Sequence, residues 1–290
     1  NHPGLRMLAD SMLQLGENDE ALEVLARVEG EQGVDAALFS KASYQLLKDG
    51  NVVGAKQMVA KSEAVSTTAD DLSRLGVLQL SLNDIDGLVN LEEAVEACNH
   101  ALTIKPDYAE PHYNIGNALQ EQGKLEEAIE AYKKALSIKP DYAEAYYNMG
   151  NALKERGNLE EAVEAYTKAI SLKPDYALAY NNMGNALKER GNLEEAVGAY
   201  TEAISLKPDY ADTYYNMGIA LKDQGNLDEA IEAYNKAISI KPDYADAFYN
   251  MGNVLKDQGN LDEAIEAFTK AISLKPDYAE AFNNMGDALR

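Results

Sequence analysis

The chain contains no tryptophan, one cysteine (Cys98) and three scattered histidines (His2, His100 and His112) among its 290 residues. A lone cysteine cannot form an internal disulfide, and these histidines have neither a metal-ligand spacing nor a serine or cysteine nucleophile beside them. A glycine-rich phosphate loop is also missing. We therefore predict a protein that is not an enzyme and that holds no metal or cofactor.

The sequence also lacks the apolar run of about 18 residues that a membrane-spanning helix requires, and it does not open on a signal peptide. Its charge is strongly one-sided, with 26 lysines and arginines against 49 acidic residues and a formal net charge of −23. Such a charge repels a phosphate backbone. We expect no membrane insertion and no nucleic-acid partner; the compartment stays unknown, with the cytoplasm favoured.

What the chain has instead is repetition. A proline that follows Lys and precedes Asp-Tyr-Ala recurs every 34 residues, at Pro106, Pro140, Pro174, Pro208, Pro242 and Pro276. A fixed period of this length is typical of solenoid proteins. Counted from the alanine of that motif, full copies start at Ala109, Ala143, Ala177, Ala211 and Ala245, and a sixth copy from Ala279 is cut at Arg290. We expect the chain to be a piece of a longer protein.

Each copy predicts two helices. In the copy from Ala143, Met149 and Leu153 share one helical face, and Gly157 ends that helix. Asn158 is placed to cap the second helix, with Glu161 three residues later in a capping-box arrangement. The second helix closes at the Lys-Pro pair, because the residue before a proline is driven out of the helical region.

The pattern resembles the tetratricopeptide repeat (TPR) family in its 34-residue period and in Met149-Gly150, Leu153, Ala162-x3-Tyr166, Ala169 and Pro174. This resemblance implies an all-α fold, a right-handed α-solenoid superhelix of helix-turn-helix repeats. The family's first-helix tryptophan is absent, and its place is taken by His112, Tyr146, Tyr180, Tyr214 and Phe248.

The resemblance suggests a domain organisation. Residues 1–68 hold two degenerate repeats, 69–108 a third with a six-residue insertion at 83–90, 109–278 five regular repeats, and 279–290 the first helix of a cut sixth repeat. Residues 62–70 are the best candidate for a joint. Cys98 occupies the place where other copies have Tyr or Phe, which predicts a buried packing residue.

One calcium-loop pattern falls within the insertion. Asp84, Asp86, Gly87 and Glu93 stand at the offsets of the third, fifth, sixth and twelfth loop positions, but Leu82 stands where the first carboxylate belongs. A polar turn before an acidic helix start explains the same residues, so we favour the turn.

The candidate functional surface lies on the first helix of each repeat, opposite the predicted core face. Two columns of polar residues recur there. The column at the sixth repeat position consists of Asn114, Asn148, Asn182, Asn216, Asn250 and Asn284. The column at the ninth position consists of Asn117, Asn151, Asn185, Ile219, Asn253 and Asp287. The residues that flank both columns are Lys154, Lys188, Lys222 and Lys256, with Tyr147, Tyr215 and Tyr249. Asparagine both donates and accepts hydrogen bonds, as an extended peptide backbone requires. The alternative is a merely exposed polar face copied by duplication.

The family resemblance implies a concave groove of first helices that holds peptides, and the asparagine column is similar to that of the superhelix in O-linked N-acetylglucosamine transferases and related bacterial TPR proteins. We therefore expect a non-catalytic scaffold that binds an extended protein segment, with basic residues favoured by Glu144, Glu155, Asp212 and Asp246. Alternatives are the substrate-recognition arm of a larger glycosyl- or sulfotransferase, and a self-assembling scaffold joined end to end through Phe282, Met285 and Leu289.

Overall fold

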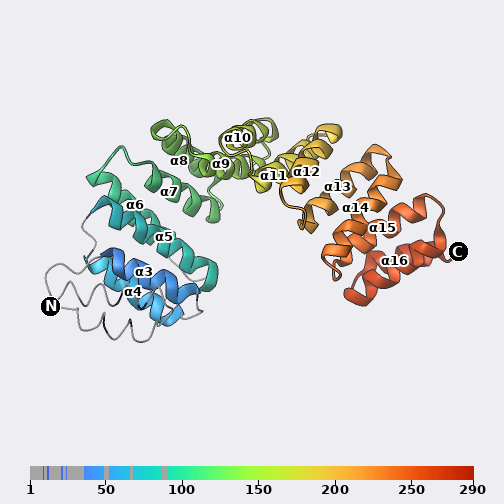
Figure 1. The fold of residues 1–290 in the computed structure, drawn as a ribbon, viewed down its shortest axis with the longest axis horizontal. Helices are drawn as coiled ribbons and strands as arrows, with labels where there is room; N and C mark the ends of the chain where they lie inside the picture. The colour runs from blue at the N-terminus through green and yellow to red at the C-terminus, as the bar shows by residue number, and fades with distance from the viewer. Residues whose placement is uncertain are drawn as a thin grey trace. The chain divides into compact units, whose positions relative to one another are not determined.

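The structure is a computed structural model that describes residues 36–48, 52–65, 68–86 and 91–290, with four single residues nearer the start. Within these segments every regular element is an α-helix (Figure 1). The chain divides into two compact units, Asn1–Asn148 and Met149–Arg290, which we describe separately. None of the described helices combines the length and apolar character needed to cross a membrane.

The first unit is built from helix pairs in which each helix packs on its neighbour in sequence. Its helices are α3 (Ala36–Lys48), α4 (Val52–Val65), α5 (Ala69–Asp86), α6 (Leu91–Ile104), α7 (Ala109–Glu121), α8 (Leu125–Ile138) and the start of α9 (Ala143–Glu155). Leu75 and Leu78 of α5 share one core cluster with Phe39 of α3 and Met58 of α4. Of the stretch that we considered as a joint, residues 62–65 belong to α4 and residues 69–70 to α5, two helices that contribute to the same core, and residues 66–67 lie outside the described residues.

The second unit begins at Met149, within α9, and has the same pattern of helix pairs. It contains α10 (Leu159–Leu172), α11 (Ala177–Glu189), α12 (Leu193–Leu206), α13 (Ala211–Gln224), α14 (Leu227–Ile240), α15 (Ala245–Asp257), α16 (Leu261–Leu274) and α17 (Ala279–Ala288). Each of α11, α13 and α15 packs on the second helix of its own repeat and on the second helix of the preceding repeat, and α17 packs on α16. The predicted all-α solenoid of helix pairs is confirmed.

In the turn between the two helices of a repeat, the predicted signal holds at the end of the first helix but not at the start of the second. Gly157 has a φ of +86°, in the left-handed region that glycine adopts without strain, and ends α9 as predicted. The predicted capping box at Asn158 is wrong, because this side chain makes no cap hydrogen bond to the backbone. Its Nδ2 donates instead to Glu161 Oε1 at 2.7 Å, and its Oδ1 accepts from Arg156 Nε at 3.1 Å.

A glycine–aromatic contact holds each helix pair together. A Cβ built on Gly184 of α11 would lie 2.6 Å from Cε1 of Tyr200 on α12, a distance that packed atoms do not reach. Tyr200 is fully buried, and the same contact recurs at Gly116, Gly150, Gly218 and Gly252 against Tyr132, Tyr166, Tyr234 and Phe268. The first helix can approach its partner closely only because this position lacks a side chain.

Cys98 fills the aromatic position of the degenerate third repeat, as predicted. Its side chain is 1% exposed, and a Cβ on Gly76 would lie 2.6 Å from its sulfur. Burial raises the pKa of the Cys98 thiol to about 12. The cysteine is therefore a packing residue that stays protonated.

The insertion lengthens α5, whose 18 residues exceed the 13 of α7. Asp84 and Asp86 belong to the last turn of this helix, while their side chains and Gly87 lie outside the described residues. Over the described part of the chain, no group of three or more His, Cys, Asp or Glu is arranged to hold a metal ion.

Candidate binding surface on the first helices

The predicted asparagine columns form a hydrogen-bonded chain between successive first helices, which we call the Asn ladder. It comprises the sixth- and ninth-position asparagines given above. In the first unit, Asn148 of α9 donates through Nδ2 to Tyr113 Oη at 3.0 Å and to Asn117 Oδ1 at 2.9 Å, both on α7. Tyr132 of α8 donates its hydroxyl to the same Asn117 oxygen at 2.8 Å. A sixth-position asparagine therefore links its repeat to the one before it.

The second unit repeats this arrangement. Asn284 of α17 donates to Tyr249 Oη at 3.1 Å and to Asn253 Oδ1 at 2.7 Å. Asn250 donates to Tyr215 Oη at 2.9 Å. The ninth-position oxygens also accept from the buried tyrosines of the second helices, with Tyr166 Oη on Asn151 and Tyr200 Oη on Asn185, both at 2.8 Å. The ladder thus joins neighbouring repeats and also joins the two helices of one repeat.

The expectation that these side chains simply face away from the core needs correction. Asn114 is buried, and the other ladder asparagines are half-buried. Helical periodicity places a residue relative to its own helix only, whereas stacking brings the neighbouring first helices against the flanks of each first helix. The ladder is consequently both a polar surface and part of the packing between repeats.

Asn216, like Asn114 of the first regular repeat, makes no hydrogen bond to any described residue. The fifth position of the preceding repeat is Asn181, where other repeats have the tyrosine hydroxyl that accepts from the sixth-position amide. Asn181 is buried, donates to Asn182 Oδ1 at 3.0 Å and accepts from Thr213 Oγ1 at 3.0 Å. Asn216 therefore presents its whole amide to this surface.

Ile219 interrupts the ladder at the ninth position of α13. The hydroxyl of Tyr234, which would donate to an asparagine there, is buried without a hydrogen-bond partner. Burial raises the pKa of this phenol. The next repeat shows the opposite change, since Asn253 is retained and the aromatic partner is Phe268.

The repeats that start at Ala177 and Ala211 give a direct test of the ladder's contribution to stability. We expect Tyr200→Phe to lower the free energy of unfolding by about 1 kcal/mol, because it removes a hydrogen bond to Asn185. Tyr234→Phe removes a hydroxyl that has no partner and should leave stability unchanged or raise it. Urea denaturation of both variants measures the difference, and an equal loss in both would show that the Tyr–Asn hydrogen bond does not stabilise the fold.

The predicted flanking residues have mixed environments. Lys154, Lys188, Lys222 and Lys256 are half-buried, and burial lowers the pKa of Lys188. The acidic residues also have roles within the fold: Tyr244 Oη donates to Asp212 at 2.9 Å and Tyr278 Oη to Asp246 at 2.8 Å. Tyr215 and Tyr249, expected beside a ligand, instead accept from ladder asparagines and pack on Tyr244 and Tyr278 with ring centroids 4.9 and 4.8 Å apart.

The sequence prediction missed the tyrosines that complete the ladder. The signal was present in the repeats, because Tyr132, Tyr166 and Tyr200 each occur 15 residues after a ninth-position asparagine. A residue pair that recurs at a fixed separation across helices is an indication of a contact, and this one would have predicted a hydrogen bond.

The family follows from the comparison with known repeats. A TPR repeat model matches residues 90–123, 116–157, 150–189, 184–225, 220–259 and 252–289, and a tetratricopeptide repeat model matches residues 3–27. The chain therefore belongs to the tetratricopeptide repeat family. A search of curated proteins gives no match.

Solved structures of TPR proteins are similar to this chain. YrrB, described as a TPR protein with an unusual peptide-binding site, is 28% identical over 65% of this chain and 97% of its own, with a TM-score of 0.58. MamA is 34% identical over 57% of this chain and 97% of its own, with a TM-score of 0.55. A chain of the APC/C hetero-tetramer Cut9-Hcn1 is 18% identical over 99% of this chain and 55% of its own length, with a TM-score of 0.62. At this level of identity the match shows only that the two chains share a fold.

Proposed function

We propose that the chain is a non-catalytic scaffold that binds an extended segment of another protein along the Asn ladder of each unit, chiefly through the segment's backbone. Protein-interaction scaffolds are the coarser class that the repeats define. The proposal rests mainly on the polar atoms that the ladder leaves available. The peptide-binding site named for YrrB supports it by similarity.

The available atoms come in complementary kinds. Asn284 uses its Nδ2 hydrogens on Tyr249 and Asn253, and its Oδ1 accepts from no described residue. Asn253 uses its Oδ1, and its Nδ2 donates to no described residue. An acceptor and a donor side by side match the N–H and C=O groups of an extended chain. The internal hydrogen bonds fix the side chains beforehand, which reduces the entropic cost of binding.

Charge favours a basic ligand. Glu155, Asp212 and Asp246 are exposed on the first helices, and Glu144 is half-buried. These carboxylates attract lysine or arginine and make binding weaken as salt rises, because exposed charges are screened over about 10 Å at 0.1 M salt.

A backbone-modified peptide tests this proposal. The probe is a fluorescein-labelled peptide of alternating Gly, Ser and Lys, followed by fluorescence anisotropy at low salt. We expect Asn216→Ala to weaken binding by up to about tenfold, since a net hydrogen bond contributes about 0.5 to 1.5 kcal/mol. Stability should barely change, because Asn216 has no internal hydrogen bond. An otherwise identical peptide with N-methylated backbone amides should bind more weakly.

The matched control is Asn235→Ala, which removes an exposed asparagine from the second helix α14. Equal binding of the N-methylated and unmodified peptides would contradict backbone recognition. An equal effect of Asn216→Ala and Asn235→Ala would place the binding surface elsewhere.

Two narrower proposals carry over from the sequence. The first is that the chain acts as the substrate-recognition arm of a larger transferase, which would use the same ladder.

The second is end-to-end self-association. Phe282 and Leu289 of the last repeat are 47% and 65% exposed, and they lie beside the half-buried Met285. Exposed apolar side chains on one helix face favour association with another copy.

A further inference from the structure

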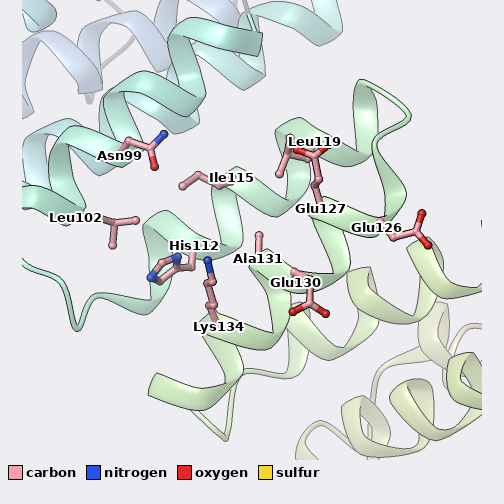
Figure 2. A pocket seen from close by; sticks show the side chains of 10 residues that line it. All are labelled: Asn99, Leu102, His112, Ile115, Leu119, Glu126, Glu127, Glu130, Ala131 and Lys134. Carbon is pink, nitrogen blue, oxygen red and sulfur yellow. The ribbon is translucent and has the colours of Figure 1, made fainter.

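A hollow lies in the first unit, on the side of α7 opposite the Asn ladder. It has a volume of about 400 Å³ and is bordered by α6, α7 and α8. His112, Ile115 and Leu119 line it from α7, at spacings that place them on one stripe of the helix. Figure 2 shows the Lys134 amine beside the His112 ring, with Glu126 at the opposite end. This hollow is therefore separate from the surface proposed above.

The hollow combines an apolar wall with an acidic border. Leu102, Ile115 and Leu119 supply aliphatic carbon, while the exposed Glu126, Glu127 and Glu130 come from the first half of α8. Lys134 is the one permanently charged cation of the lining, and Lys133, outside it, donates to Glu130 at 2.9 Å. The carboxylates outnumber these cations, so the border is negative.

His112 distinguishes this repeat from those that follow. The equivalent residue is aromatic in the next four repeats: Tyr146, Tyr180, Tyr214 and Phe248. Burial, and secondarily Lys134, lower the pKa of His112, so the imidazole adds no positive charge near neutral pH. A smaller side chain at this position leaves room that a tyrosine ring would occupy.

We propose that this hollow is a binding site for a short segment of a partner protein that carries an apolar side chain next to lysine or arginine. The apolar side chain packs on Leu102, Ile115 and Leu119. The basic group lies near Glu126 and Glu127, where charge complementarity favours it. A lysine or arginine stem can also cover aliphatic surface while its charged head stays in water. The site would give the scaffold a second, sequence-selective contact.

The test uses the whole chain and a fluorescein-labelled peptide, Gly-Leu-Arg-Leu-Arg-Gly, followed by fluorescence anisotropy. We expect Glu126→Gln with Glu127→Gln to weaken binding by about two- to thirtyfold, the range for two exposed charge pairs. His112→Tyr should weaken binding by filling the hollow. Gly-Leu-Glu-Leu-Glu-Gly should bind more weakly than the arginine peptide.

The repeat architecture supplies a matched control in Glu160→Gln with Glu161→Gln, which changes the same two positions one repeat later. An equal loss in both double variants would mean that general charge attraction, not this hollow, binds the peptide. Unchanged binding to His112→Tyr would also overturn the proposal. The loss caused by Glu126→Gln with Glu127→Gln should be the same size with and without Asn216→Ala, because the hollow and the ladder bind the peptide separately, so a failure of the hollow is distinguishable from a failure of the proposed ladder function. The glutamine variants alter exposed residues only, which keeps the test decisive if His112→Tyr fails to fold.

Discussion

Replacing Gly184 with alanine should lower the free energy of unfolding by about 1 to 3 kcal/mol, although alanine is the better helix former. The added methyl would lie 2.6 Å from the fully buried Tyr200 ring. Neither helix can move away without losing the close approach on which the pair depends. The midpoint of urea denaturation, compared with the unchanged chain, measures the loss.

Gly198→Ala is the control for this substitution. Gly198 lies within α12, and a Cβ there would meet nothing within 4 Å. Alanine at this exposed position should raise stability by roughly 0.5 to 1 kcal/mol through helix propensity alone. If both variants were equally stabilised, the Tyr200 ring would have to shift freely, and close packing against glycine would not hold the repeat together.

Cys98 should react about a thousandfold more slowly with a thiol reagent such as DTNB at pH 8 than an ordinary cysteine, because its pKa rises from 9.0 to about 12 and only the thiolate attacks. Its burial also keeps the reagent away from the sulfur, which slows the reaction further. Since the chain has no other cysteine, every reacted thiol reports on this position. Absorbance at the released thiolate follows the reaction, and urea-unfolded protein gives the reference rate.

The same pKa shift predicts the direction of a pH effect. The folded chain keeps the Cys98 proton to higher pH than the unfolded chain, so the unfolded state binds fewer protons between about pH 9 and 12. The contribution of this group to stability is complete below pH 9 and is lost as the pH rises toward 12. Fast reaction of the folded chain with DTNB at pH 8 would contradict both the burial of Cys98 and the rise in its pKa.

The fold was predictable because its main determinants are local and repeated. The proline spacing, the left-handed glycine turns and the apolar stripes each specify a helix or its end, and five copies make the pattern unambiguous. The burial of Cys98 was predictable for the same reason, since its place in the repeat is aromatic in the other copies. The capping box failed because the Asn158 and Glu161 side chains hydrogen-bond to each other.

The environment of the candidate surface was less predictable. A helical wheel places Asn148 opposite its core face, but it cannot show that Tyr113 and Asn117 of the preceding repeat lie within hydrogen-bonding distance. That proximity arises from stacking, which brings together residues more than 30 positions apart in sequence. The partnerless Tyr234 hydroxyl likewise depends on where its ring points, which the sequence does not state.

Ile219 also bears on how the second unit opens. Each repeat of a solenoid is held only by its neighbours, so local unfolding separates the array at a weakly coupled interface. Within the Asn ladder, α15 is joined to α13 by one hydrogen bond, from Asn250 to Tyr215, because Ile219 cannot accept a second one. In contrast, Asn284 joins α17 to α15 by two hydrogen bonds, to Tyr249 and Asn253. Amide protons of α15 to α17 should therefore exchange with solvent as one block. The interface between α13 and α15 then limits how far an opening at the carboxyl end spreads toward α13.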